Sequence, residues 1–153
     1  MLKKLEKLIK KLVDHDVEIE MDDEFRYDVD DGGTIYYTID EDFNTECNID
    51  WKEFLAKHYN FDLTEENWFV LSILHELGHH YTIEYFSADE WNKMCTMLKS
   101  NDRKKVNFDH FNKLNERVAT EWAISYYNAN PKEMKYFCSK INAELKKIKC
   151  ANT

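Results

Sequence analysis

The sequence predicts a single, mostly helical α+β domain that carries a small antiparallel β-sheet of two or three strands. Two patterns and the chain length support this fold class. Residues 17–39 have strand-like patterns, whereas the chain after Trp51 shows helical periodicity. The 153 residues match about one domain, and no linker rich in Pro, Gly or Ser divides them. We therefore expect residues 1–153 to form one domain.

The first 13 residues are expected to form an amphipathic helix. Apolar residues recur at helical spacing with lysines between them: Leu2, Leu5, Leu8, Ile9 and Leu12. Such a helix usually packs on its own domain and leaves its lysines in solvent. The same pattern also fits a helix that lies on anionic lipid or on a partner protein.

Residues 17–39 are expected to form the sheet. Residues 17–21 alternate apolar and acidic side chains, so the acidic positions would form a solvated face. Two further strand-like runs, residues 25–29 and 34–39, flank the sequence Asp30-Asp31-Gly32-Gly33. That sequence is typical of a turn between two strands, which predicts a hairpin.

Helical patterns dominate the rest of the chain. A short helix is expected over residues 51–58, followed by one over 64–85, with Thr64 as its N-cap. From Trp68 to about Tyr85 this helix is apolar almost all round, which is typical of a central, buried helix. Ser87 and Glu90 have the spacing of a capping box for the next helix. Helices over 108–128 and 131–149 complete the prediction, and the last one opens at Pro131.

Composition and charge exclude several classes of protein. The chain has 21 basic and 30 acidic residues, for a net charge of −9, and no direct contact with nucleic acid is expected. No apolar run reaches the roughly 18 residues of a membrane span. The four cysteines form no C-x-x-C pair, so neither a disulfide framework nor a cysteine zinc site is expected. We expect a cytoplasmic protein with reduced thiols.

The residues that carry chemistry lie on the predicted buried helix. His75-Glu76-Leu77-Gly78-His79 is an H-E-x-x-H motif. Positions i and i+4 differ by about 40° around a helix, so His75 and His79 project from one face and can hold one Zn²⁺. Glu76 lies about 60° from His79, close enough to accept a proton from water without binding the metal. Glycine is unfavourable within a helix, and Gly78 therefore suggests that another chain segment or a substrate approaches closely there.

A zinc hydrolase needs a third protein ligand and one open position. The sequence offers three candidates: Glu116, Glu121 and His110. Small residues share the helix side of Glu116, namely Ala119, Thr120 and Ala123, and would let that helix approach the metal helix. Helical geometry alone leaves the choice among the three candidates open. His80 points too far round its helix to complete the site.

These motifs resemble the ImmA/IrrE family of minimal gluzincin metallopeptidases. That family pairs H-E-x-x-H with a downstream helix, matched here by Glu116-x-x-Ala119-x-x-Trp122-Ala123. The segment that starts at Asn115 is also similar to the N-E-x-x-S-D ligand segment of thermolysin-like enzymes. The resemblance spans about residues 17–130 and implies a zincin-like helical domain whose small sheet edges the cleft. It also implies that Glu116 is the third metal ligand, with His75 and His79.

The resemblance implies a zinc-dependent metallopeptidase that holds one Zn²⁺ per chain and uses Glu76 as general base. Its substrate would be a protein or peptide, in particular a transcriptional repressor in a phage or mobile-element setting. A toxin-like or virion-associated peptidase fits the same motifs. The alternative from another class is a zinc-bearing interaction module without turnover. Its docking face would be the acidic segment 14–66, with 19 acidic and three basic residues, although solubility is the favoured explanation of such charge.

Overall fold

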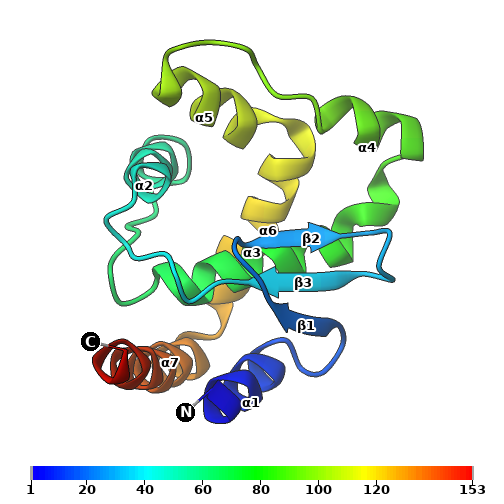
Figure 1. Ribbon diagram of the computed structural model, residues 1–153. Helices are drawn as coiled ribbons and strands as arrows, with labels where there is room; N and C mark the ends of the chain where they lie inside the picture. Colours follow the sequence, from blue (N-terminus) through cyan, green and yellow to red (C-terminus); the bar gives the residue numbers. More distant parts are fainter. Residues whose placement is uncertain (1, 153) are drawn as a thin grey trace.

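The structure, a computed structural model, describes residues 2–152 and shows a mostly helical α+β fold (Figure 1). Met1 and Thr153, the ends of the predicted domain, lie outside the described residues. The elements in chain order are α1 (Leu2–Leu12), β1 (Glu18–Met21), β2 (Arg26–Asp28), β3 (Thr34–Tyr37), α2 (Glu46–Tyr59), α3 (Trp68–Thr82), a 3₁₀ turn (Ile83–Tyr85), α4 (Ala88–Met94), α5 (Arg103–Asn112), α6 (Leu114–Ala129) and α7 (Pro131–Ala151).

The sheet has three strands in the order β1-β3-β2. The predicted hairpin is confirmed, because β2 and β3 pair antiparallel and Gly32 and Gly33 adopt positive φ in the turn. The prediction of a purely antiparallel sheet is wrong, because β1 pairs parallel to β3, with Ile19 opposite Ile35. A hairpin turn determines only its own two strands. The chain after β1 reverses before β2, which leaves β1 to pair with the other edge of the buried strand β3.

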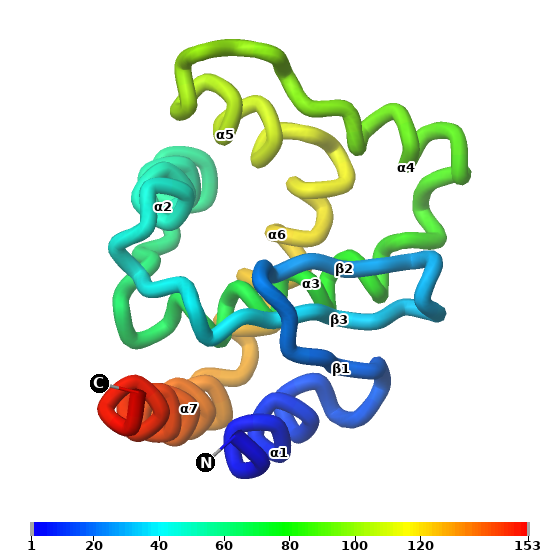
Figure 2. Tube along the Cα trace, viewed as in Figure 1, coloured from blue at the N-terminus to red at the C-terminus, as the bar shows by residue number. Residues whose placement is uncertain are grey.

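Helix α3 is the centre of the fold, as its apolar sequence predicts. It packs against α6, α7 and strands β2 and β3, and most of its residues are buried (Figures 1 and 2). It begins at Trp68 and not at Thr64. The Thr64 N–H donates to Asn67 Oδ1, and the Asn67 N–H donates to Thr64 Oγ1, so these two residues close a separate turn before the helix. The predicted last residues, Ile83–Tyr85, form the 3₁₀ turn.

The helix predicted over residues 108–128 is in fact two helices. Helix α5 ends at Asn112 and α6 begins at Leu114, because Lys113 between them has an extended backbone with ψ of 145°. Asp102 caps α5, which starts earlier than predicted and packs against α2, whereas α6 packs against α3. Two different packing partners require the chain to change direction at Lys113. As a result, His110 and Glu116 lie on different helices.

The two terminal helices lie side by side along one edge of the fold (Figure 2). Leu5, Ile9 and Leu12 of α1 are buried against the domain, so the expected packing of this amphipathic helix is confirmed for residues 2–12. The capping box of Ser87 and Glu90 is also confirmed, and α7 opens at Pro131. Within residues 2–152, no helix combines the length and hydropathy that a membrane crossing requires.

Gly78 allows α3 and α6 to approach closely. A Cβ atom built on Gly78 would lie 2.5 Å from the carbonyl oxygen of Ala119, which is backbone and cannot swing aside. Small side chains line the facing side of α6, where Ala119, Thr120 and Ala123 are all buried. The sequence-based expectation of a close approach at Gly78 is therefore confirmed, with α6 as the approaching segment.

Gly78→Ala should destabilise the protein, although alanine is the better helix former by about 1 kcal/mol. The added methyl group forces α3 and α6 apart, and such overpacking typically costs about 1–3 kcal/mol. Urea unfolding with a chelator present measures the effect without any contribution from metal. Asn92→Ala, at an exposed helical position, is the control and should change stability by less than about 0.5 kcal/mol. A Gly78→Ala protein as stable as the parent would contradict this account of the contact.

Candidate metal centre

Two helices supply the candidate metal-binding side chains. His75 and His79 lie one turn apart on α3, and Glu116 lies in the first turn of α6. The close packing of these helices at Gly78 and Ala119 brings the three side chains together. The His75 and Glu116 side chains are 12% and 13% exposed and that of His79 is 5% exposed, so the group is largely shielded from bulk water.

The three side chains converge on one another through the atoms that would bind a metal. His75 Nε2 lies 3.1 Å from Glu116 Oε1, and His79 Nε2 lies 2.9 Å from Glu116 Oε2. One nitrogen of each imidazole and one carboxylate oxygen all lie within 4.8 Å of one another. Tetrahedral ligands at about 2.0–2.2 Å from zinc are roughly 3.3–3.5 Å apart, so small movements of these three side chains would admit an ion. Two nitrogens and one oxygen leave the fourth position open, as in catalytic zinc sites.

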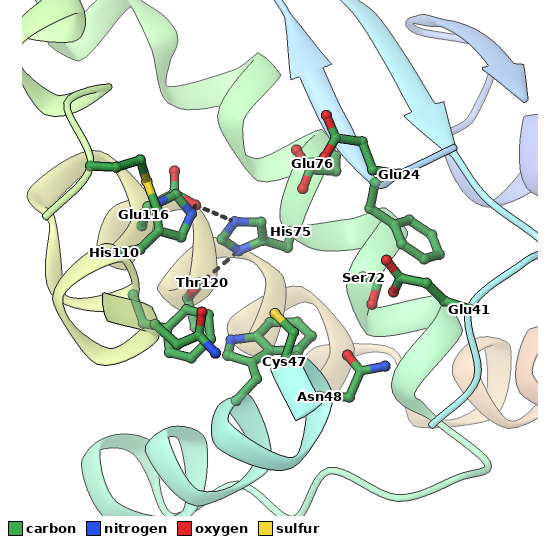
Figure 3. Close-up of a pocket in the computed structure, with 15 residues that line it drawn as sticks. Glu24, Glu41, Cys47, Asn48, Ser72, His75, Glu76, His110, Glu116 and Thr120 are labelled. Carbon is green, nitrogen blue, oxygen red and sulfur yellow. Dashed lines mark hydrogen bonds and ion pairs between the residues drawn. The ribbon is translucent and has the colours of Figure 1, made fainter. Parts of the chain in front are cut away.

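Thr120 orients His75 from the side away from the convergence point. Its Oγ1 lies 3.0 Å from His75 Nδ1, and Figure 3 shows this contact beside the one between His75 and Glu116. A hydroxyl group can both donate and accept. Thr120 can therefore donate to Nδ1 while Nε2–H faces Glu116, or accept from Nδ1–H when Nε2 offers its lone pair to a metal. The sequence places Thr120 one turn after Glu116, and the structure confirms that it is a neighbour of the site.

Glu116 is ionised despite its burial. Burial by itself raises the pKa of a carboxyl group, but the facing imidazoles of His79, His110 and His75 outweigh burial and hold the pKa of Glu116 well below its usual range. A carboxylate that stays charged in a shielded position is suited to bind a cation. It also explains how α3 can hold two imidazoles inside a helix that is otherwise apolar.

Glu76 differs from Glu116 in its surroundings. It is 8% exposed, and its carboxylate makes no hydrogen bond or ion pair with any group in residues 2–152. Burial raises the pKa of Glu76 to about 7, with the neighbouring His75 opposing this rise and the Glu116 carboxylate adding to it. A carboxyl group with a pKa near neutrality, beside but outside the converging ligands, is suited to accept and release protons.

The other candidate ligands have separate positions. Glu121 is exposed on α6 and is not part of the converging group. His110 lies beside the group, and its Nε2 is 3.2 Å from Glu116 Oε1, the same oxygen that faces His75 Nε2. His80 is held by Tyr27, whose hydroxyl lies 3.0 Å from His80 Nδ1, as expected for a residue that points away from the site.

A cleft of about 400 Å³ opens in front of His75 and Glu76. Its walls include residues that sequence reasoning missed, among them Phe25, Glu41 and Trp51. Each comes from a different segment, and no local motif marks them. Trp51 also contacts the site directly, because its ring packs edge-on against the His75 ring, with the ring centroids 5.8 Å apart.

Comparisons with known proteins add no relative to this description. No protein-family model, no curated protein and no solved structure matches the chain. The candidate centre therefore stands on its own geometry.

The centre should bind one Zn²⁺ per chain. Protein dialysed after exposure to Zn²⁺ should retain about one equivalent, measured by elemental analysis, and Glu116→Gln should retain far less because it removes the anionic ligand. Glu121→Gln is the matched control on the same helix and should retain the full equivalent. Acidification below about pH 6 should release the ion, because protonated imidazole cannot ligate. Full zinc retention by Glu116→Gln would contradict the assignment.

Thr120→Val should weaken zinc binding without abolishing it. Valine keeps the shape of threonine but removes the hydroxyl that meets His75 Nδ1, and loss of such an outer contact typically lowers metal affinity about 10–100-fold. Competition against a coloured chelator measures the change. Ser72→Ala, which removes a hydroxyl bonded within α3 to the Trp68 carbonyl, is the control and should leave affinity nearly unchanged. Equal affinities for Thr120→Val and the parent would show that this contact does not support the centre.

Proposed function

We propose that this chain is a zinc-dependent metallopeptidase. The observation that carries the proposal is the convergence of His75, His79 and Glu116, with the unpaired Glu76 carboxylate beside them at the cleft. Structural zinc sites are usually closed by four protein ligands. Three ligands and a nearby proton acceptor instead match the donor set of a hydrolytic site.

Zinc is the metal that this donor set favours. Imidazole nitrogen suits zinc and its neighbours in the transition series, whereas calcium and magnesium prefer sites made of oxygen. When bound, zinc supplies Lewis acidity, which polarises the scissile carbonyl and lowers the pKa of water towards about 7. His75, His79 and Glu116 would hold it, and Thr120 would orient His75.

Glu76 carries the proton transfers in this mechanism. Its carboxylate accepts a proton from the attacking water, and the resulting carboxylic acid then donates that proton to the leaving amine. A pKa near 7 suits both steps, since the group must take up and release a proton in each cycle. Its burial also limits exchange of that proton with bulk water.

The resemblance to the ImmA/IrrE family supports a regulatory role for this peptidase. We propose a repressor-like protein as its substrate, in a phage or mobile-element setting and within the cytoplasm. This proposal rests on the H-E-x-x-H motif and the Glu116 helix, and the proximity of His75, His79 and Glu116 supports it. The sheet edge also borders the cleft, since Glu24 and Phe25, just before β2, line it.

The second candidate is a zinc-bearing interaction module that binds a regulator without cutting it. The acidic segment 14–66 favours it, because exposed carboxylates there, such as Glu18 and Glu20 on β1, offer a charged face to a partner. A module of this kind would need zinc for its structure but would have no use for Glu76.

Glu76→Gln should retain zinc and lose hydrolysis. The amide keeps the shape of the side chain but cannot accept a proton, and loss of a general base typically lowers the rate about 10²–10⁴-fold. Cleavage of a fluorogenic peptide library measures the rate, and elemental analysis measures the zinc. Glu121→Gln should keep both zinc and activity. Zinc-loaded parent protein that cleaves no peptide, and a Glu76→Gln protein that regulates its partner normally, would favour the interaction module.

A further inference from the structure

The lining of the cleft beside the candidate centre is partly apolar and partly acidic. Four large apolar side chains line it: Phe25, Trp51, Met97 and Phe111. Phe25 is anchored edge-on against Phe69 and Trp68, with ring centroids 5.3 and 6.0 Å apart. The aromatic walls are therefore built into the core of the fold. They offer a surface on which an aliphatic chain can pack.

The acidic character comes from two carboxylates that the proposed chemistry does not use. Glu24 precedes β2, and Glu41 follows β3, so both project from the sheet side of the cleft. Figure 3 shows them on the side of the pocket away from Glu116 and His110. None of the residues that line this cleft is lysine or arginine.

Neither carboxylate has a strong partner within the described chain. Glu41 is half-buried and makes no hydrogen bond or ion pair with any group in residues 2–152. Glu24 has one distant cation, the Arg26 guanidinium, with Nε 3.9 Å from Glu24 Oε1. Burial, and then the charges of Glu24 and Asp42, raise the pKa of Glu41 above its usual range. A shielded carboxylate with acidic neighbours is stabilised when a cation binds.

We infer that this cleft binds a lysine or arginine side chain of the peptide substrate. The inference rests on the proposed function and names the substrate class of that same site. The methylene stem of the side chain would pack on Phe25 and Trp51, and its charged head would meet Glu41 and Glu24, since long cationic side chains bury their stems and keep their heads in polar surroundings. An acidic side chain would meet like charge, and a neutral one would leave Glu41 shielded without a partner.

Small peptide hydroxamates test this preference without requiring turnover. The hydroxamate group chelates zinc, and the probes carry lysine, norleucine or glutamate as the only varied side chain. Norleucine has the stem of lysine without the ammonium group. Zinc-loaded protein should bind the lysine probe about tenfold more tightly than the norleucine probe, and the glutamate probe most weakly, because hydrogen bonds to charged groups are worth about a factor of ten or more. Competition or calorimetry measures the affinities.

Glu41→Gln links the preference to its proposed cause. This variant should keep its zinc and its affinity for the norleucine probe, while the lysine-to-norleucine ratio should fall from about ten towards one. Glu18→Gln, which removes a carboxylate from an exposed position on β1, is the matched control and should leave the ratio unchanged. Glu24→Gln should lower the ratio less than Glu41→Gln, because the Glu24 side chain is 64% exposed.

The results separate this inference from the proposed function. Zinc-loaded protein that binds the norleucine or glutamate probe as tightly as the lysine probe overturns the inference and leaves the peptidase proposal standing. A ratio that does not change in Glu41→Gln overturns it as well. Protein that shows the predicted preference but hydrolyses no peptide contradicts the peptidase proposal and keeps the binding site. Protein that takes up no zinc contradicts both.

Discussion

The close contact of α3 and α6 at Gly78 is the constraint on which the candidate site depends. The backbone of Ala119 lies so near Gly78 that no side chain fits between the helices. His75 and His79 lie on either side of this contact in the sequence of α3, and Glu116 lies one turn before Ala119 on α6. The separation that places Glu116 Oε2 2.9 Å from His79 Nε2 is thus set by two backbones and not by flexible side chains. A rigid support of this kind is what a metal centre needs.

The same contact also lets a helix at the centre of the core carry polar chemistry. Imidazole and carboxyl groups are costly inside an apolar helix unless they are paired. Glu116 pairs with both histidines, and Thr120 satisfies the outer nitrogen of His75. The Glu76 carboxylate, in contrast to that of Glu116, makes no hydrogen bond or ion pair within residues 2–152, and burial raises its pKa to about 7. The unpaired group is therefore the one to which the proposed mechanism assigns proton transfer, and it borders the cleft that would admit a substrate.

The sequence predicts features that depend on local periodicity. The buried α3, the amphipathic α1, the hairpin of β2 and β3, and the convergence of His75 and His79 all follow from spacing along one element. Gly78 also indicates a close approach to α3, although the sequence does not show that α6 is the approaching segment. Features that depend on packing between distant segments could not be predicted. No proline or glycine marks Lys113, where the chain passes from α5 to α6, so the break between these helices and the contact of His110 with Glu116 were not foreseen. The pairing of β1 with β3 and the position of Glu41 in the wall of the cleft also depend on packing between distant segments, so they could not be predicted either.

The most direct test of this account is a crystal structure of the zinc-loaded protein. It should show one ion held by His75, His79 and one carboxylate oxygen of Glu116, each about 2.0–2.2 Å from the metal, with Glu76 beside the ion but not bound to it. Glu121 should remain in solvent, and His110 should contact Glu116 and not the ion. An ion bound through His110 or Glu121 in place of Glu116, or bound elsewhere on the molecule, would contradict the account.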